Sequence, residues 1–307
     1  MNTTAIAAAI RARSTTPSVA RLRDFVELTK PRLSFMVLIT VAVAMLVCDA
    51  GSVSLLTLAA VVGSTGLVAA SACVWNQIAE RRIDAKMGRT ADRPLPAGRV
   101  SVTEASCFSI VSLVLGCGGL TVSGGIWSAG LGLLTWLIYV VIYTPMKQRS
   151  AWNTFYGAIA GALPVLIGWS ATAAPLDSIS LAKGMAIFTV VFLWQFPHFM
   201  AIAWKYRDDY ANASLRMASV VEPTGRLSGR IAIVAAAALL PVTASLAFVG
   251  SFTPLYLGLV TFLGVWQLSL AVRFARARTA HSARVLLRAS LVYLPLLLLC
   301  ITCIPIL

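Results

Sequence analysis

Long runs of apolar residues are the feature that most constrains how this 307-residue chain can fold. An α-helix needs about 20 apolar residues to cross the hydrocarbon core of a bilayer, and runs of that length recur along the sequence. They lie near residues 33–49, 53–76, 102–122, 126–143, 152–172, 181–202, 231–249, 253–272 and 286–306. Hydrophobic residues make up 59% of the chain and charged residues only 12%. The pattern therefore predicts an all-α, polytopic membrane protein with nine transmembrane helices.

The positive charge of the chain is distributed unevenly between the predicted loops. The formal net charge is +14, and of the 25 Lys and Arg residues only Lys183 belongs to the loops on one side of the predicted bundle. The positive-inside rule places the other side, which includes the N-terminus, in the cytoplasm. Topology and attraction to anionic lipid account for the basic excess, so we expect no nucleic-acid partner.

The chain is expected to contain one transmembrane domain. Residues 1–30 are interpreted as a cytoplasmic N-terminal tail, because their apolar stretch is too short for the core of a signal peptide. An Arg-rich mitochondrial presequence is the alternative for this segment. Residues 31–307 form the transmembrane domain, and no hydrophilic segment within them is long enough for a separate soluble domain.

The first polar cluster stands at the end of the second predicted span. Asn76, Glu80 and Asp84 recur at a spacing of four residues, which places three oxygen-bearing side chains on one helical face. Such hard oxygen ligands suit Mg²⁺, an ion that shares its coordination sites with phosphate oxygens. The alternative is a solvated helix end whose carboxylates pair with neighbouring cations at Arg81, Arg82 and Lys86.

The segment after this cluster favours the metal interpretation. It supplies Arg89, Arg93 and Arg99, and Pro94 with Pro96 indicates an irregular loop between them. Arginine side chains match phosphate oxygens in a bidentate geometry. We therefore expect this loop to bind a diphosphate group.

A second polar cluster follows the sixth predicted span. If the helix continues through it, His198, Lys205 and Asp209 share one stripe, with Asp208 one step around. The two carboxylates could hold a second Mg²⁺, while Lys205 and Arg207 contact diphosphate. The alternative is a charged helix end within an interfacial belt of aromatic residues. That alternative leaves His198, a polar residue inside a span, without a role.

Further residues on the same side complete the predicted site. The stretch "YTPMKQRSAWN" brings Tyr143 and Lys147, and Lys147 would neutralise phosphate charge that the metals leave uncompensated. Aromatic residues near His198 could line a pocket for an isoprenoid tail and stabilise a cation through their π faces. These are Phe192, Trp194, Phe196 and Phe199.

Several sequence blocks in order carry a resemblance to a known family. They are "ELTKPR", the stretch from Asn76 to Pro94, "YTPMK", "GAIAGALPVLIGW", "WQFPHF" and "KYRDDY". With these blocks, almost the whole chain resembles the intramembrane prenyltransferases of the UbiA superfamily, and within it the branch that prenylates haem. The resemblance implies nine helices around a central cavity, with Mg²⁺ and diphosphate held between two acidic inner loops.

The resemblance also implies roles for individual residues. Asn76, Glu80 and Asp84 match the first metal-binding motif, Asp208 and Asp209 match the second, and His198 belongs to the haem branch. The diphosphate would be contacted by Arg89, Arg93, Tyr143, Lys147, Lys205 and Arg207. The sequence departs from the family pattern where Glu80 replaces Asp, and where Ser214, Leu215 and Arg216 replace a Gly-Ile-Pro turn before Met217.

The implied reaction transfers a farnesyl group from farnesyl diphosphate to a vinyl group of haem B, giving haem O and diphosphate. Ionisation would yield an allylic cation, the vinyl group would attack it, and water would capture the product cation. His198 would either position that water or contact the porphyrin. The implied location is the inner (plasma) membrane of a bacterium, with the mitochondrial inner membrane as the alternative. Association with a haem A synthase or a terminal oxidase is a further implication.

Two other functions remain open at the level of the sequence. One is prenylation of an aromatic quinone precursor such as 4-hydroxybenzoate. The other is ion-coupled transport, which also uses Asp, His and Lys residues within a membrane domain. A transporter should carry its charges near mid-membrane, whereas here they gather at one surface.

Overall fold

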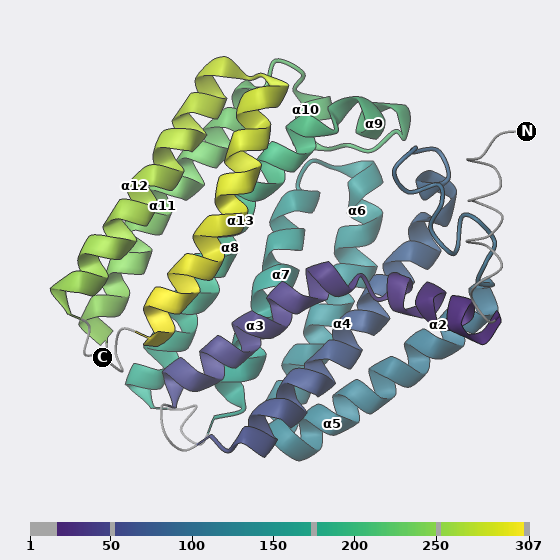
Figure 1. Ribbon diagram of the computed structural model, residues 1–307, viewed down its shortest axis with the longest axis horizontal. Coiled ribbons are helices and arrows are strands. Elements are labelled where there is room, and N and C mark those ends of the chain that lie inside the picture. The colour runs from purple at the N-terminus through teal and green to yellow at the C-terminus, as the bar shows by residue number, and fades with distance from the viewer. Residues whose placement is uncertain (1–16, 50–52, 173–176, 250–252, 304–307) are drawn as a thin grey trace, which may run out of the picture.

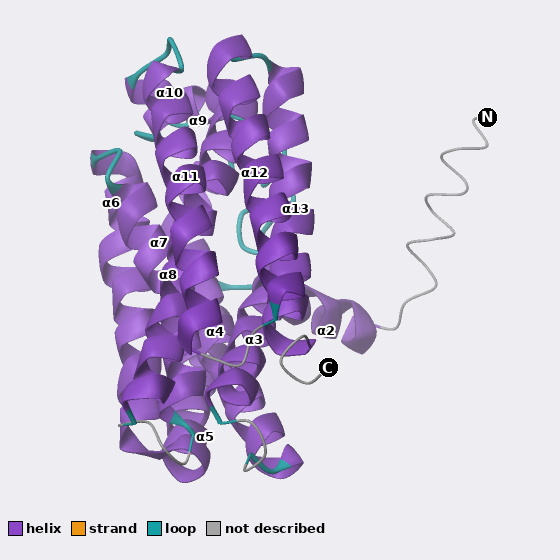
Figure 2. Cartoon of the chain, turned by 90° about the vertical axis from the view of Figure 1, so that its left-hand side faces the viewer, coloured by secondary structure: helices purple, strands orange, loops and turns teal. Residues whose placement is uncertain are grey.

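The computed structural model describes residues 17–49, 53–172, 177–249 and 253–303, and nearly all of these residues are helical (Figure 1). No strand occurs within those ranges (Figure 2). The helices are α2 (Pro17–Leu28), α3 (Pro31–Cys48), α4 (Leu55–Asp84), α5 (Val102–Leu137), the π-helical segment η1 (Ile138–Tyr143), α6 (Thr144–Arg149), α7 (Asn153–Ser170), α8 (Ser178–Lys205), α9 (Arg207–Asn212), α10 (Ala218–Val221), α11 (Arg226–Val249), α12 (Pro254–Ala277) and α13 (Ala280–Cys303). The predicted all-α, polytopic class is confirmed.

Seven helical stretches in the described part of the chain are long and apolar enough to cross a membrane. One of them, Val102–Arg149, has 48 residues, which is far more than one crossing needs. Gly125 interrupts it with φ 81° and ψ 173°, a conformation that breaks the helix in two. Helix α7, with 18 residues, is not among the seven. The count of nine spans and the cytoplasmic N-terminus stay predictions, and residues 304–306 of the last expected span lie outside the described residues.

The segment expected as an N-terminal tail contains a helix docked on the bundle. Residues 1–16 lie outside the described residues, but Pro17–Leu28 forms α2 (Figure 1). Its last residue, Leu28, is fully buried in a cluster with Val74 and Ile78 of α4. Asp24 accepts a hydrogen bond from Arg99 at 2.8 Å. The end of α2 is thereby fixed close to the start of α3.

The long helices form two groups joined through α3 and α7. In one group α8 packs with α11 and α13 around a hydrophobic core, and in the other α4 packs along α5. Helices α3 and α7 lie between the groups, and α3 crosses the front of the molecule in Figure 1. The short helices α6, α9 and α10 gather at one end, where the polar loops lie.

Small residues permit the closest of these helix contacts. A Cβ atom on Gly168 of α7 would stand 2.3 Å from the backbone oxygen of Val41 in α3. A Cβ atom on Gly161 would stand 2.2 Å from Oε1 of Gln195 in α8. Close backbone approach at small residues is a principal source of helix association in membranes, where the hydrophobic effect does not act between helices.

We expect Gly168→Ala to lower the stability of the bundle by about 1–3 kcal/mol, because the new methyl group has no space against the α3 backbone. The measurement is the apparent Tm of the purified protein in detergent. Gly258→Ala is the matched control, since its Cβ atom would meet no atom within 4 Å and alanine favours a helix. Equal Tm values for the two variants would contradict the packing argument.

Candidate active site

The first polar cluster lies on the inner face at the end of α4. Asn76, Glu80 and Asp84 are 0%, 8% and 1% exposed, so all three are buried. Their spacing of four residues holds them on one face of the continuous helix, as the sequence predicts. This burial contradicts the alternative interpretation of the cluster as a solvated helix end.

Each carboxylate of this cluster pairs with a cation from another segment. Nζ of Lys147 lies 2.9 Å from Oε1 of Glu80, and Nη1 of Arg93 lies 2.7 Å from Oδ2 of Asp84. In the described part of the chain, neither carboxylate pairs with Arg81, Arg82 or Lys86. Buried charges require such partners, because a lone charge in a low-dielectric interior is costly.

Lys30 completes the cluster and was not identified as a site residue from the sequence. Its ammonium group donates to Oδ1 of Asn76 at 2.7 Å, and Nδ2 of Asn76 donates to Oγ1 of Thr144 at 3.0 Å. Burial lowers the pKa of Lys30 from its usual value. The only sequence signal for Lys30 is its place in the block "ELTKPR". Its backbone adopts the left-handed conformation, with φ 48°, just before Pro31.

The oxygen atoms of the cluster fit a divalent cation in part. The ammonium group of Lys147 contacts both oxygens of Glu80, Oε1 at 2.9 Å and Oε2 at 3.3 Å. Two carboxylates and an amide oxygen on one helical face are a donor set that suits Mg²⁺. Among the described residues, however, no three Asp, Glu, His or Cys side chains gather as a ready-made metal cluster. A metal site here would need oxygen atoms from the substrate or the second acidic loop.

The second polar cluster differs from the arrangement expected for a continuous helix. Helix α8 ends at Lys205, Tyr206 departs from helical geometry with φ −112°, and α9 begins at Arg207. The predicted stripe through His198, Lys205 and Asp209 on one helix is therefore wrong. The ammonium group of Lys205 lies over the ring of Tyr206. It also donates a hydrogen bond to the hydroxyl of Tyr206 at 2.8 Å.

The carboxylates of the second cluster remain accessible. The side chain of Asp208 is 87% exposed, and its Oδ1 atom lies 3.6 Å from Nε of Arg207. Asp209 is half-buried and forms no ion pair within the described ranges. The guanidinium group of Arg207 also lies over the ring of Trp204, 4.8 Å from its centroid. The carboxylates of the second acidic motif are thus more exposed than those of the first.

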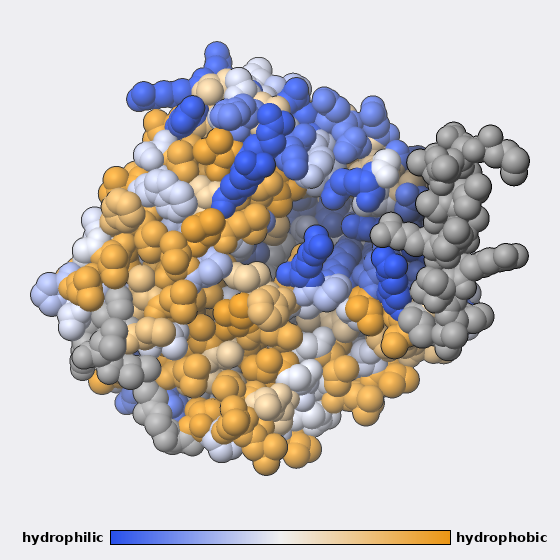
Figure 3. Space-filling model, in the orientation of Figure 1, coloured by the Kyte–Doolittle hydropathy of each residue, from blue (hydrophilic) through white to orange (hydrophobic). Residues whose placement is uncertain are grey.

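Contacts between two loops bring the two acidic motifs to the same end of the bundle. The guanidinium group of Arg89 lies over the rings of Tyr206 and Tyr210, at 4.9 and 5.6 Å. Met87 and Tyr210 also share a small hydrophobic cluster with Leu215. Figure 3 shows hydrophilic side chains around a hollow between α13 and the side formed by α4 and α6. The loops that follow α4 and α8 thus lie in contact at this end of the bundle, as predicted.

The departure from the family pattern at residues 214–216 forms part of this junction. Ser214 adopts the left-handed conformation with φ 57°, and the next residue, Leu215, is buried. The backbone N–H of Arg216 donates to the carbonyl of Lys147 at 2.7 Å, and Asn153 donates to the carbonyl of Arg216 at 3.1 Å. The turn therefore ties the second loop to α6 and α7, next to the cation that pairs with Glu80.

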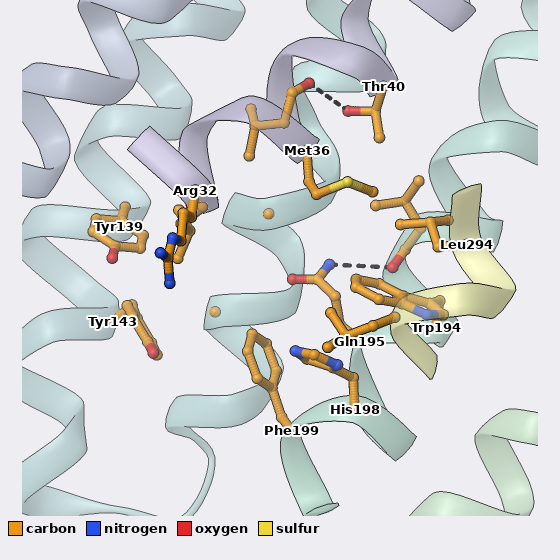
Figure 4. A pocket seen from close by; sticks show the side chains of 16 residues that line it. Arg32, Met36, Thr40, Tyr139, Tyr143, Trp194, Gln195, His198, Phe199 and Leu294 are labelled. Carbon is orange, nitrogen blue, oxygen red and sulfur yellow. Dashed lines mark hydrogen bonds between the residues drawn. The ribbon is translucent and has the colours of Figure 1, made fainter. Parts of the chain in front are cut away.

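An apolar cavity of about 320 Å³ lies beside the polar cluster. Tyr143 joins the two, because its ring lines the cavity and also contacts the ammonium group of Lys147 at 4.7 Å. Figure 4 shows aromatic, aliphatic and polar side chains of several helices facing this space. The labelled residues are Arg32, Met36, Thr40, Tyr139, Tyr143, Trp194, Gln195, His198, Phe199 and Leu294.

The predicted aromatic lining is confirmed for two of its four residues. Trp194 and Phe199 line the cavity, whereas Phe192 and Phe196 do not. Phe192 instead packs edge-on against Phe155 and Phe196. The error arises because residues two positions apart on a helix point to opposite sides, so Phe192 and Phe196, which share one face of α8, point away from the side that carries Trp194.

The comparisons with known proteins give the fold and family. The model of the UbiA prenyltransferase family matches residues 37–294. A protein of Solibacter usitatus (strain Ellin6076) named protoheme IX farnesyltransferase is 39% identical over 90% of this chain and 96% of its own length. A protein of the same name from Rhodopirellula baltica is 41% identical over 90% of this chain and 98% of its own length.

Solved structures share the fold at low sequence identity. A structure described as a UbiA homologue from Archaeoglobus fulgidus bound to GPP and Mg²⁺ has a TM-score of 0.70 and 16% identity, covering 92% of this chain and all of the other. A digeranylgeranylglyceryl phosphate synthase has a TM-score of 0.75 and 16% identity, covering 94% and 99% of the two chains. Because the family model matches residues 37–294 and these relatives are 39% and 41% identical over 90% of the chain, this chain belongs to the UbiA prenyltransferase family.

Proposed function

We propose that this protein transfers a farnesyl group from farnesyl diphosphate to a vinyl group of haem B, forming haem O and releasing diphosphate. The observation that carries the proposal is the contact chain Glu80–Lys147–Tyr143, which joins a buried charged cluster to an apolar cavity. Such a junction suits a substrate with an anionic head and an isoprenoid tail. The haem acceptor is supported by the names of the relatives in Solibacter and Rhodopirellula.

The diphosphate would bind at the polar end of the bundle. Mg²⁺ would be held by Asn76, Glu80, Asp84, Asp208 and Asp209, and would neutralise the charge that develops on the departing diphosphate. Arg93 and Lys147 already stand at the carboxylates, so both can turn to phosphate oxygens when the metal takes their present partners. Arg89, Tyr143, Lys205 and Arg207 are the further proposed contacts.

The cavity would protect the reactive allylic cation. Its lining is predominantly apolar, which limits the water that would otherwise quench the cation. The rings of Tyr143, Trp194 and Phe199 face the space and can stabilise positive charge. The vinyl π bond of haem B would attack the cation, and one water molecule would then add to the resulting carbocation with loss of a proton, which leaves a hydroxyl group.

The cellular setting follows from the same comparison. The chain is a multi-pass membrane protein by its apolar helices, and its relatives in Solibacter and Rhodopirellula are bacterial. We therefore place it in the bacterial inner membrane, with its diphosphate site at the cytoplasmic face. Association with a haem A synthase or a terminal oxidase stays a prediction.

Asp84→Asn is expected to lower the rate of haem O formation by about 100-fold or more, because it removes one of the charges that position the diphosphate and its metal. The assay mixes purified protein, farnesyl diphosphate, haem B and Mg²⁺, and haem O is quantified by mass spectrometry. Asp92→Asn is the control, since Asp92 is an exposed carboxylate in the same loop. The proposal fails if Asp84→Asn retains the activity of the control while both variants stay folded.

Removal of divalent cations is expected to abolish the transfer and leave the fold intact. The carboxylates of the first motif keep Lys147 and Arg93 as partners, so the protein should remain stable with a chelator present. The measurement compares haem O formation and apparent Tm in EDTA, before and after Mg²⁺ is restored. Full activity in EDTA would show that the acidic motifs do not serve a metal.

A further inference from the structure

His198 is held in one orientation at the wall of the cavity. Its ring stacks on Trp194 with the centroids 4.8 Å apart and an angle of 23° between the planes. Its Nδ1 atom lies 2.8 Å from Oγ of Ser290 on α13. Trp194 is fixed in turn, because its Nε1 donates to the backbone oxygen of Ser290 at 2.8 Å. Figure 4 shows the imidazole pointing into the cavity beside Gln195 and Phe199.

The hydrogen bonds of Ser290 favour one tautomer of His198. A serine hydroxyl has one hydrogen to donate and two lone pairs to accept with. Oγ of Ser290 donates to the carbonyl of Leu287 at 2.8 Å, one turn earlier on the same helix. Donation to Leu287 leaves the hydroxyl to accept from His198, and in that arrangement Nδ1 carries the proton and Nε2 keeps a free lone pair.

No hydrogen bond to Nε2 occurs in the part of the chain that the structure describes, although the ring is more than half-buried. A neutral imidazole with Nδ1–H bound to a hydroxyl or carbonyl is the usual state of a histidine that binds a metal. Histidine is also a common axial ligand of haem iron.

We propose that Nε2 of His198 coordinates the iron of haem B when this substrate enters the cavity, and that Ser290 is a positioning residue that holds the required tautomer. The identity of the acceptor rests on the proposed function. Coordination would fix the centre of the porphyrin against α8 and α13. Arg32, which lines the same cavity from α3, offers a cation for a porphyrin carboxylate.

The first experiment titrates the full-length protein in lipid nanodiscs with ferric haem and records absorption and EPR spectra. Wild-type protein should show the signature of imidazole-ligated iron, and His198→Ala should lose it. His281→Ala is the matched control, because His281 is the second of the two histidines and is exposed at the start of α13. Added imidazole should restore the signature in His198→Ala, and metal-free protoporphyrin IX should bind wild type and variant equally.

The second experiment tests the role of Ser290. Ser290→Ala should weaken ferric haem binding by about 10-fold, the lower end of the usual effect of losing such a partner, without changing the affinity for metal-free protoporphyrin. Ser290→Thr keeps the hydroxyl and should retain the wild-type affinity for ferric haem. Nitrogen-15 NMR of labelled histidine should report the Nδ1–H tautomer in the wild type and its loss in Ser290→Ala.

The inference is overturned if His198→Ala keeps the wild-type iron spectrum, if wild-type protein that makes haem O never shows imidazole-ligated iron, or if NMR finds Nε2–H in the wild type. The same preparations are assayed for farnesyl transfer. Loss of imidazole ligation with transfer intact would remove this inference alone. Iron ligation without any transfer to haem would instead contradict the proposed function.

Discussion

Two carboxylates buried at the end of a transmembrane helix are the constraint on which the polar end of this structure depends. Glu80 and Asp84 are each less than 10% exposed, and a charge so placed is stable only beside an opposite charge. The partner cations do not come from α4 itself. Lys147 arrives from α6 and Arg93 from the loop that follows α4, so each ion pair also fixes the position of another segment. The ion pairs that form the site therefore also hold the segments at this end of the bundle together.

The need of a buried charge for a partner also sets the boundary between the polar site and the apolar cavity. The ammonium group of Lys147 forms an ion pair with Glu80 on one side and lies over the ring of Tyr143 on the other. That ring forms part of the cavity wall. A cation can stand this close to an apolar space because an aromatic face interacts favourably with both. An amphiphilic substrate would encounter charge and apolar surface within the length of one side chain.

The sequence predicted those features that depend on local spacing. The apolar runs gave the all-α membrane class, and the spacing of Asn76, Glu80 and Asp84 gave their common face. Features that depend on distant partners were not predictable: Lys30 binds Asn76 across 46 positions, and Ser290 binds His198 across 92. The break at Tyr206 was also missed, because no proline or glycine marks it and the cause is the packing of Tyr206 and Tyr210 against the loop that carries Arg89.

The unequal state of the two acidic motifs explains how a buried charge cluster can admit a charged substrate. In the present arrangement each carboxylate of the first motif is neutralised by one cation, while in the second motif Asp208 is exposed and Asp209 is half-buried. If Mg²⁺ and diphosphate enter together, the metal replaces the cations at the carboxylates and the phosphate oxygens replace the carboxylates at Lys147 and Arg93. Every buried charge keeps a partner through this exchange, so the desolvation cost already incurred in folding is not incurred again. In the proposed reaction, the more exposed second motif would meet the incoming metal first, and the buried first motif would complete its site.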